Sequence, residues 1–352
     1  MSAIRVVGCD ILRIFAMICV TAIHFTEYSG VSRLPFNELG LIDFIFVNSL
    51  RSFTVCFVDI FVLLTGYFMA SRETSLKKIL ILWGEVIFVG VFTIIFCILL
   101  GEPISIKSII KAVFPISCGS YWFINSYFLL YLISPILNQI IKYIKPGRAL
   151  LIMSLIMLFI GINPLMDTTQ YIGPASGVFW FSYVYLIGAY IRFYGIPNIS
   201  KSTWLYLGGG IYMIILFLFL TGLNLPGRTQ LISTNNIVPL ILSISIFMLL
   251  KDIKLQSKLF SSFVSILSVC ALNVYLIQES DAFRGILWKC FDAQKCIGKG
   301  NAFSMILMFI ACIICLWIGA YVTHKVYVKL VYPFIDWVNE KYLKNVKLLN
   351  IE

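Results

Sequence analysis

The sequence predicts an all-α membrane protein that crosses the bilayer about ten times and contains no soluble domain. Hydrophobic residues make up 60% of the 352 residues, and charged residues only 12%. The mean hydropathy is +0.96. A soluble domain is closer to half apolar and a quarter charged, and even a large one leaves about a quarter of its chain surface in water. Lipid is therefore needed to cover the apolar surface of this chain.

A series of apolar runs supports the same fold class, because each is near the roughly 20 residues that a membrane-crossing helix needs. The connections between the runs are too short for a soluble domain. The stretch 41–51 either extends the second run or lies along the membrane interface. We expect a membrane domain at 1–325 and a tail at 326–352, whose apolar, aromatic and lysine residues predict an amphipathic segment on the inner membrane surface. The runs lie at about 9–29, 52–70, 79–100, 121–141, 149–164, 178–194, 204–223, 235–250, 261–280 and 303–324.

Lysine and arginine residues predict the orientation of these helices. With ten helices and the N-terminus inside, the inner segments hold 17 Lys and Arg residues and the outer segments hold 9. Cytoplasmic segments are enriched in these residues, so both termini are expected in the cytoplasm. The ninth connection, with four basic residues on the outer side, departs from the trend. The first run is expected to be a retained helix and not a signal peptide, because Asp10 and Arg13 lie within its start.

The net charge of +11 does not indicate nucleic-acid binding. The basic residues occur in small groups between apolar runs, and positive loops at a membrane explain them better than a nucleic-acid surface does. The chain has only two histidines, and seven of its ten cysteines lie in apolar runs, so no metal site is expected. Cys290 and Cys296 lie in an expected outer loop, where they either form a disulfide or remain two free thiols.

The first run carries a stripe of polar residues. Arg13 and His24 are eleven positions apart, which places them about 20° apart around a helix and about 16 Å apart along it. Asp10 and Glu27 lie three residues outside this pair, on nearly the same face. A charge near the bilayer centre costs roughly 2.5–3.5 kcal/mol, so the stripe must face protein or a wet cavity. The residues form either structural pairs or a site for a long ligand that enters from the cytosol.

The segment CDILRIFAMICVTAIH resembles the first-helix signature of the membrane acyltransferase-3 family, in which an acidic residue and an arginine are followed by ten residues and a histidine. Further family-like motifs follow in order and extend over nearly the whole chain. The resemblance implies a multi-pass acyltransferase in the cytoplasmic membrane of a bacterium. The motifs are VDIFVLLTGYF at 58–68, YWFINSYFLLYLISPIL at 121–137, FSYVYLIGAYI at 181–191 and LNVYLIQES at 272–280.

Two features depart from the family pattern. Many relatives have Tyr-Leu-x-His in the penultimate helix, whereas Gln278 takes the histidine position here, after Tyr275. The loop after the second helix often carries a dense arginine cluster, whereas this chain has SLKKILIL. The first difference removes a second proton-transfer group and puts more weight on His24.

The resemblance implies transfer of an acyl group, typically acetyl, from cytosolic acyl-CoA to a hydroxyl of a glycan or glycolipid. An imidazole, with an ordinary pKa of about 6.5, suits the general base for such a hydroxyl, and His24 is the candidate. Glu27 lies one turn from His24, where it either orients the ring or faces the outer headgroups. Arg13 is expected to hold the phosphates or amides of the donor, and Asp10 to fix its guanidinium group.

Other residues are candidates for contact with substrate or for support of the site. Asp59 and Glu85 are carboxylates within apolar runs and hence functional candidates, and pairing with Arg13 or Arg51 is their more ordinary role. Trp122 lies at a helix end, where it either stacks on a sugar or belongs to an aromatic belt. Tyr275 and Gln278 are included because they lie in a family-like motif.

Two other function classes remain open. A transporter or flippase for a lipid-linked or secreted saccharide would use the polar stripe as a path, without His24 as a base. A structural membrane partner would use the stripe as a helix interface. The three consecutive glycines at 208–210 lack the flanking strand and Lys-Ser/Thr pair of a phosphate loop, and we expect them to let helices pack closely.

Overall fold

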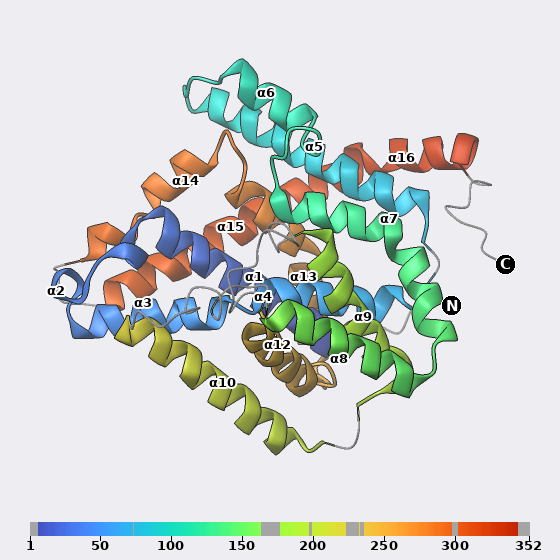
Figure 1. Ribbon diagram of the computed structural model, residues 1–352. Helices are drawn as coiled ribbons and strands as arrows, with labels where there is room; N and C mark the ends of the chain where they lie inside the picture. Colours follow the sequence, from blue (N-terminus) through green and yellow to red (C-terminus); the bar gives the residue numbers. More distant parts are fainter. Residues whose placement is uncertain are drawn as a thin grey trace.

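The computed structural model describes residues 6–72, 74–162, 177–196, 199–222, 232, 236–297 and 302–343. This part of the chain is helical and contains no strand, which confirms the all-α class (Figure 1). The helices are α1 Val7–Tyr28, η1 Val31–Arg33, α2 Phe36–Leu39, α3 Leu41–Thr54, α4 Phe57–Met69, α5 Leu76–Leu99, α6 Ile106–Val113, α7 Trp122–Tyr143, α8 Pro146–Ile162, α9 Val178–Tyr194, α10 Lys201–Thr221, α12 Ile237–Leu250, α13 Lys258–Gln278, α14 Arg284–Cys290, η3 Ala293–Cys296, α15 Ala302–Leu330, α16 Tyr332–Val338 and η4 Asn339–Leu343.

Each of the ten expected apolar runs overlaps a helix, although the run ends at 163–164, 223 and 235 lie outside the described residues. The helices α8, α9 and α12 have 17, 17 and 14 residues, which is below the roughly 20 that span a bilayer without tilt. The chain is a multi-pass membrane protein. Within the described residues, seven segments are long and apolar enough to cross a membrane: Val7–Tyr28, Leu41–Met69, Leu76–Leu99, Trp122–Tyr143, Lys201–Thr221, Lys258–Gln278 and Ala302–Leu343.

The stretch 41–51 belongs to α3, which continues into α4 after a break at Val55 and Cys56. The hydroxyl of Ser243, on α12, donates a hydrogen bond to the carbonyl of Cys56 at 2.7 Å. The same carbonyl also accepts a hydrogen bond from the backbone N–H of Ile60 at 3.4 Å, so the bond from Ser243 is a second contact, which ties α12 to the break. Beyond the break, α4 packs against α9 in the most extensive helix contact of the bundle.

The helix α7 contains Pro135, whose ring nitrogen has no hydrogen to donate to the carbonyl of Tyr131. The hydroxyl of Ser134 donates to that carbonyl instead, at 2.7 Å. The residue before the proline therefore satisfies the carbonyl that the proline leaves free. This allows α7 to continue to Tyr143.

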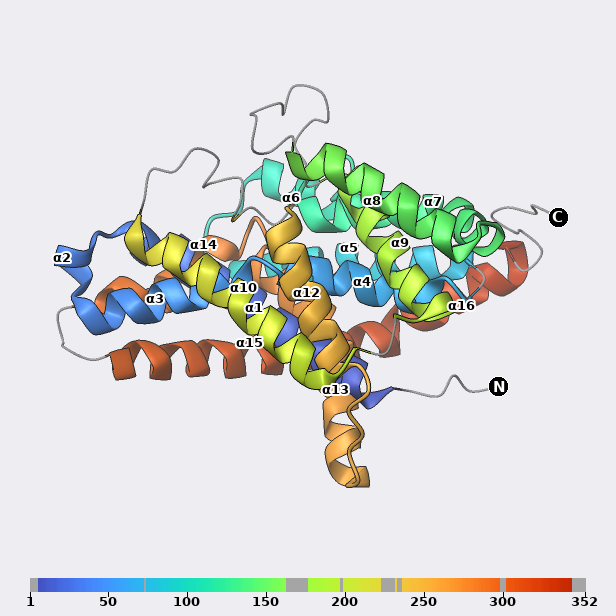
Figure 2. The ribbon, with the colours of Figure 1, turned by 60° about the horizontal axis from the view of Figure 1, so that its bottom comes forward.

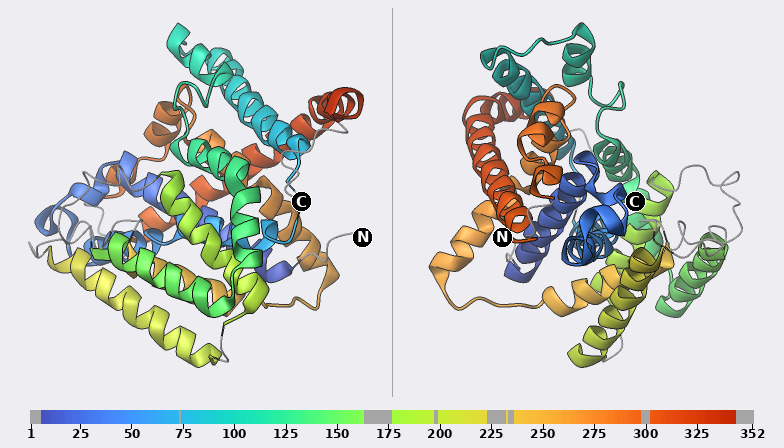
Figure 3. Two further views of the ribbon diagram at one scale, coloured as in Figure 1. Left: turned by 45° about the vertical axis from the view of Figure 1, so that its right-hand side comes forward. Right: turned by 90° about the vertical axis from the view of Figure 1, so that its left-hand side faces the viewer.

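The short helix α6 lies beside the end of α5, at the edge of the bundle opposite α10 (Figures 1 and 3). Lys111 on α6 pairs with Asp281 at 2.6 Å. Burial raises the pKa of Asp281, but the hydrogen bond and charge of Lys111, with a hydrogen bond from Ser108, lower it below its ordinary value overall. Cys290 and Cys296, which follow in the chain, are free thiols, so the structure contains the second of the two expected alternatives.

The beginning of α1, the end of α4 and the beginning of α5 meet at one end of the bundle. Guanidinium groups of Arg13 and Arg72 lie 5.4 and 5.7 Å from the ring centre of Phe68. The helix α16 joins the same end, because Lys77 on α5 pairs with Asp336 (Figure 2). The first and last described helices therefore share one side of the bundle. The expected domain boundary at 325 falls inside α15, and residues 344–352 lie outside the described part.

Candidate active site

A cavity of about 710 Å³ follows the polar stripe of α1. Its walls come from α1, α4, α5, α7 and α13. Two residues of the stripe, Arg13 and His24, therefore face this space, whereas Asp10 and Glu27 lie outside its lining and pair within the protein. Its lining includes Arg13, Arg72 and Lys78 toward one end and His24, Trp122 and Tyr275 toward the other, among further polar and aromatic residues.

The cationic end of the cavity has a fixed guanidinium group. Arg13 donates to the Oδ1 atom of the buried Asp10 at 2.9 Å. The hydroxyl of Ser268, on α13, donates to the same oxygen at 2.9 Å. Arg13 and Arg72 lie over the same ring of Phe68. Arg72 was not predicted as a site residue, although it lies in the loop that carries an arginine cluster in many relatives.

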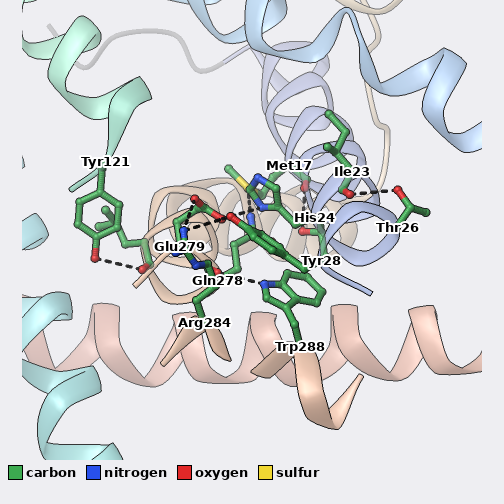
Figure 4. A network of polar contacts seen from close by, with 12 residues as sticks. Met17, Ile23, His24, Thr26, Tyr28, Tyr121, Gln278, Glu279, Arg284 and Trp288 are labelled. Atoms are coloured by element: carbon green, nitrogen blue, oxygen red, sulfur yellow. Dashed lines mark hydrogen bonds and ion pairs between the residues drawn. The ribbon is translucent and has the colours of Figure 1, made fainter. Parts of the chain in front are cut away.

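His24 lies on the same helix, about 16 Å further along the axis. Its Nδ1 atom is 3.6 Å from the Oε1 atom of Glu279, which directly follows α13. The hydroxyl of Tyr28 donates to the same carboxylate oxygen at 2.7 Å, and Arg284 lies 3.7 Å from the second oxygen (Figure 4). The rings of Tyr28 and Trp288 pack against the imidazole, with centres 5.5 and 6.3 Å away. The imidazole thus has a carboxylate on one side and an aromatic surround.

Glu27 is paired elsewhere. Its carboxylate lies 3.5 Å from Arg51 on α3 and 3.9 Å from Arg33 in η1. The carboxylate that contacts His24 is Glu279, which the sequence analysis did not single out. The available signal was an acidic residue at the end of an apolar run, within the motif that contains Tyr275.

Gln278, at the place of the family histidine, lies beside His24 (Figure 4). Its side chain is fully buried and its Nε2 atom lies 3.7 Å from the sulfur of Met17. Its backbone carbonyl accepts a hydrogen bond from the indole of Trp288 at 3.4 Å. Both Gln278 and Glu279 therefore contact the surroundings of the imidazole from the end of α13.

The family model described as "Acyltransferase domain" matches residues 6–325. The chain belongs to the acyltransferase-3 family. The match extends over nearly the whole chain and confirms the resemblance seen in the sequence motifs. Comparisons with curated proteins and with solved structures gave no match. Family membership makes the chain a membrane acyltransferase, and the cavity residues named above all lie within the matched part.

The remaining candidates have different positions in this acyltransferase. Asp59 is fully buried and accepts a hydrogen bond from the indole of Trp180 at 2.9 Å. Glu85 lies 3.0 Å from the Nδ1 atom of His324. These carboxylates therefore contact Trp180 and His324, whereas the sequence had suggested Arg13 or Arg51. Trp122 lines the cavity, and 42% of it is exposed.

The cavity of this acyltransferase-3 protein can therefore hold an extended ligand with chemically different ends. A long anionic group fits the end with Arg13, where cations gather. An imidazole with a carboxylate partner occupies the other end, where it can accept and return a proton. Arg13 and His24 both lie on α1, which separates them by about three helical turns.

Proposed function

We propose that this membrane acyltransferase transfers an acyl group, acetyl in the first instance, from cytosolic acyl-CoA to a hydroxyl of a glycan or glycolipid. The proposal rests on the observation that Arg13 and His24 line the same cavity. An acyl-CoA carries phosphates at one end and a neutral thioester at the other. The distribution of cations along the cavity matches this polarity.

The donor phosphates bind at the end with Arg13, Arg72 and Lys78. A guanidinium group can make two parallel hydrogen bonds to a phosphate, provided that its plane is fixed. Asp10 fixes the plane of Arg13, at 2.9 Å, without filling its remaining donors. The thioester then extends along α1 toward His24. The proposed location is a bacterial cytoplasmic membrane with this end of the bundle facing the cytoplasm.

His24 acts as the general base. The Nδ1–H group faces Glu279, which leaves the Nε2 atom to accept the proton of the acceptor hydroxyl. As that proton leaves, the hydroxyl oxygen bonds to the thioester carbonyl carbon. The C–S bond then breaks, and the departing thiolate takes the proton from the imidazolium. The thiolate is a good leaving group, so the reaction needs no covalent intermediate with the protein.

The acceptor binds at the aromatic part of the cavity. Trp122 and Tyr275 line the space near His24, and the indole of Trp122 remains largely accessible. Ligand sites of this kind combine apolar and aromatic walls with a few polar groups that orient the ligand. A sugar ring has apolar faces and hydroxyl edges, and it suits such a lining. Trp122 is the surface on which we place it.

Two substitutions test the proposal because they should have different effects. His24→Ala should lower the turnover by roughly 10²–10⁴-fold and leave donor affinity nearly unchanged. Arg13→Ala should weaken acyl-CoA binding, and Arg13→Lys should restore it only in part, because an ammonium group lacks the planar fork. The measurements are donor binding, release of free thiol from acetyl-CoA, and acetylation of surface glycan in cells.

Matched controls come from the same chain. Arg33→Ala removes an arginine whose side chain is 78% exposed and lies outside the cavity lining. His324→Ala removes the other histidine, also outside that lining. If His24→Ala keeps near-normal acetylation, His24 is not the base and a transporter or structural role gains. If Arg13→Ala binds the donor normally, Arg13 is only the ion-pair partner of Asp10.

A further inference from the structure

A second cavity of about 430 Å³ lies between α5, α13, α14 and α15. We call it the lateral groove. One wall contains Ile277 and Leu287, which belong to the segment that carries Gln278, Glu279 and Trp288. Other lining residues are Phe96, Phe283, Ile286, Cys290, Leu316 and Gly319.

The mouth of the lateral groove lies between two lipid-facing surfaces. On α5, Phe96 lines the groove while 42% exposed, and Leu99 beside it is 78% exposed. On α15, Ile314 and Ile318 flank the lining residues and are 53% and 60% exposed. Both helices belong to segments able to cross a membrane. Because both flanking helices are exposed and apolar here, we expect the opening to face the hydrocarbon core and its occupant to come from the bilayer.

The polar groups of the lateral groove are already satisfied within the protein. The hydroxyl of Thr93 lies 2.7 Å from that of Ser280. The hydroxyl of Thr323 donates to the carbonyl of Gly319 at 3.0 Å. Sites for polar small molecules present a few convergent hydrogen-bonding groups to fix the ligand. The groove offers none from its two threonines, which favours a hydrocarbon chain.

We propose that the lateral groove binds an acyl chain of an anionic phospholipid, with the headgroup phosphate at Lys289. The helix α14 turns Phe283, Ile286 and Cys290 toward the groove, and Lys289 is exposed beside them. Lys295 donates to the carbonyl of Lys289 at 2.9 Å, which brings a second ammonium group to the same place. Basic groups at the membrane surface attract anionic lipid headgroups.

Two other cations near the groove, Arg284 and Lys111, are already paired with carboxylates, so we place the headgroup at Lys289 and Lys295. Arg284, also on α14, lies 3.7 Å from Glu279 and donates to Tyr28. Lys111 is paired with Asp281. The proposal does not depend on the proposed acyl transfer, because it concerns lipid binding alone. A bound chain would pack against Ile277 and Leu287 and so stabilise the segment that holds Glu279 beside His24.

The test uses the full-length protein in nanodiscs that contain phosphatidylglycerol with a photoreactive group in its acyl chain. Mapping of the crosslinked peptides should show labels on Phe96, Ile286 and Leu316 well above those on lipid-facing Ile318. A β-carbon at Gly319 would contact only the side chain of Ile277, at 3.6 Å, so Gly319→Phe fills the groove without a backbone clash. It should reduce groove labelling roughly tenfold, because it displaces buried methylenes.

Two control variants separate the contribution of the lipid acyl chain from that of the lipid headgroup. Gly209→Phe adds the same side chain on α10, where a β-carbon meets nothing within 4 Å, and should leave the labelling unchanged. Lys289→Gln should remove the preference for phosphatidylglycerol over phosphatidylcholine while the chain still labels the groove.

Four results would overturn the proposal. The first is equal labelling of the groove and of Ile318 in the wild-type protein, which needs no variant to fold. The second is unchanged labelling in Gly319→Phe. The others are crosslinks between two copies of the chain through the groove, and displacement of the probe by a co-purified saccharide-linked lipid.

Discussion

Glu279 contacts several of the polar side chains around the imidazole of His24. Tyr28 donates to one carboxylate oxygen at 2.7 Å, and Arg284 lies 3.7 Å from the other. These contacts hold the carboxylate in place even though its 3.6 Å distance to His24 is too long for a hydrogen bond. Catalytic hydrogen bonds are often long before substrate binds. If His24 is the base, as we propose, Glu279 is placed to position the ring and to stabilise an imidazolium.

Glu279→Gln should lower the turnover by roughly 10²-fold, because the amide cannot stabilise the protonated ring as a carboxylate does. Donor affinity should remain unchanged, since Glu279 is not in the lining of the cavity. The dependence of rate on pH should also change, because the base would lose the charge that favours its protonated form. Turnover measured across pH, together with donor binding, checks this.

Glu27→Gln is the matched control, because Glu27 lies one turn from His24 but pairs with Arg51 and Arg33. It should retain most of the activity. If Glu27→Gln loses as much turnover as Glu279→Gln while both proteins remain folded, the role expected from the sequence belongs to Glu27 after all. A pH–rate profile that is the same for Glu279→Gln and the wild type would also contradict the assignment.

The site illustrates what periodicity can predict. Arg13 and His24 share a helix, so their common face and separation follow from helix geometry alone. Tyr28 and Glu279 are 251 positions apart, and their contact depends on how α13 ends against α1. No spacing in the sequence carries that information. The partner of Asp59 was missed for the same reason, since Trp180 comes from another helix, 121 positions away.

At the scale of helices, glycine positions decide how closely α4 and α9 approach. A β-carbon at Gly188 would meet the backbone carbonyl of Leu63, and one at Gly66 would meet the carbonyl of Tyr185. Neither obstacle is a flexible side chain. Small residues at such crossings let helix backbones pack closely in membranes. The three-glycine run is different, because only Gly208 has a close neighbour, Ser245, and Gly209 and Gly210 face open space.

Gly188→Ala should destabilise the protein by about 1–3 kcal/mol, because the added methyl forces the two helices apart. Gly209→Ala should have no such effect and should be neutral or slightly stabilising, since alanine favours the helix. Thermal unfolding of both variants in the same detergent measures the difference. Equal midpoints for Gly188→Ala and the wild type would show that the contact between α4 and α9 is not as tight as the structure has it.

Hydropathy predicted where helices occur but not where they are interrupted. The break between α3 and α4 lies within a mostly apolar stretch, and Ser243 on a distant helix contacts it through a hydrogen bond to the Cys56 carbonyl. Pro135, by contrast, is visible in the sequence, and its neighbour Ser134 supplies the compensating bond locally. Interruptions supported from nearby residues can be anticipated, whereas those supported by tertiary contacts cannot.

At the scale of the whole molecule, the proposed function requires one orientation in the membrane. The contacts of Phe68 and the pair of Lys77 with Asp336 place the beginning of α1, the beginning of α5 and α16 at one end of the bundle. The cationic part of the cavity lies at that end. The excess of 17 inner over 9 outer Lys and Arg residues, counted for ten helices with the N-terminus inside, predicts that this end faces the cytoplasm.

Reporter fusions test this orientation directly. A phosphatase, which is active only outside the cytoplasm, should be inactive when fused after residue 352 and active when fused after Gly101, between α5 and α6. A reporter that is active only in the cytoplasm should give the opposite pattern at the two positions. If residue 352 is found outside, Arg13, Arg72 and Lys78 face away from the cytosolic acyl-CoA pool. The helical bundle and the family membership would stand, but the donor would have to enter past Tyr28 and Arg284. The guanidinium group of Arg284 is already paired with the carboxylate of Glu279, so it is less able to bind the donor phosphates.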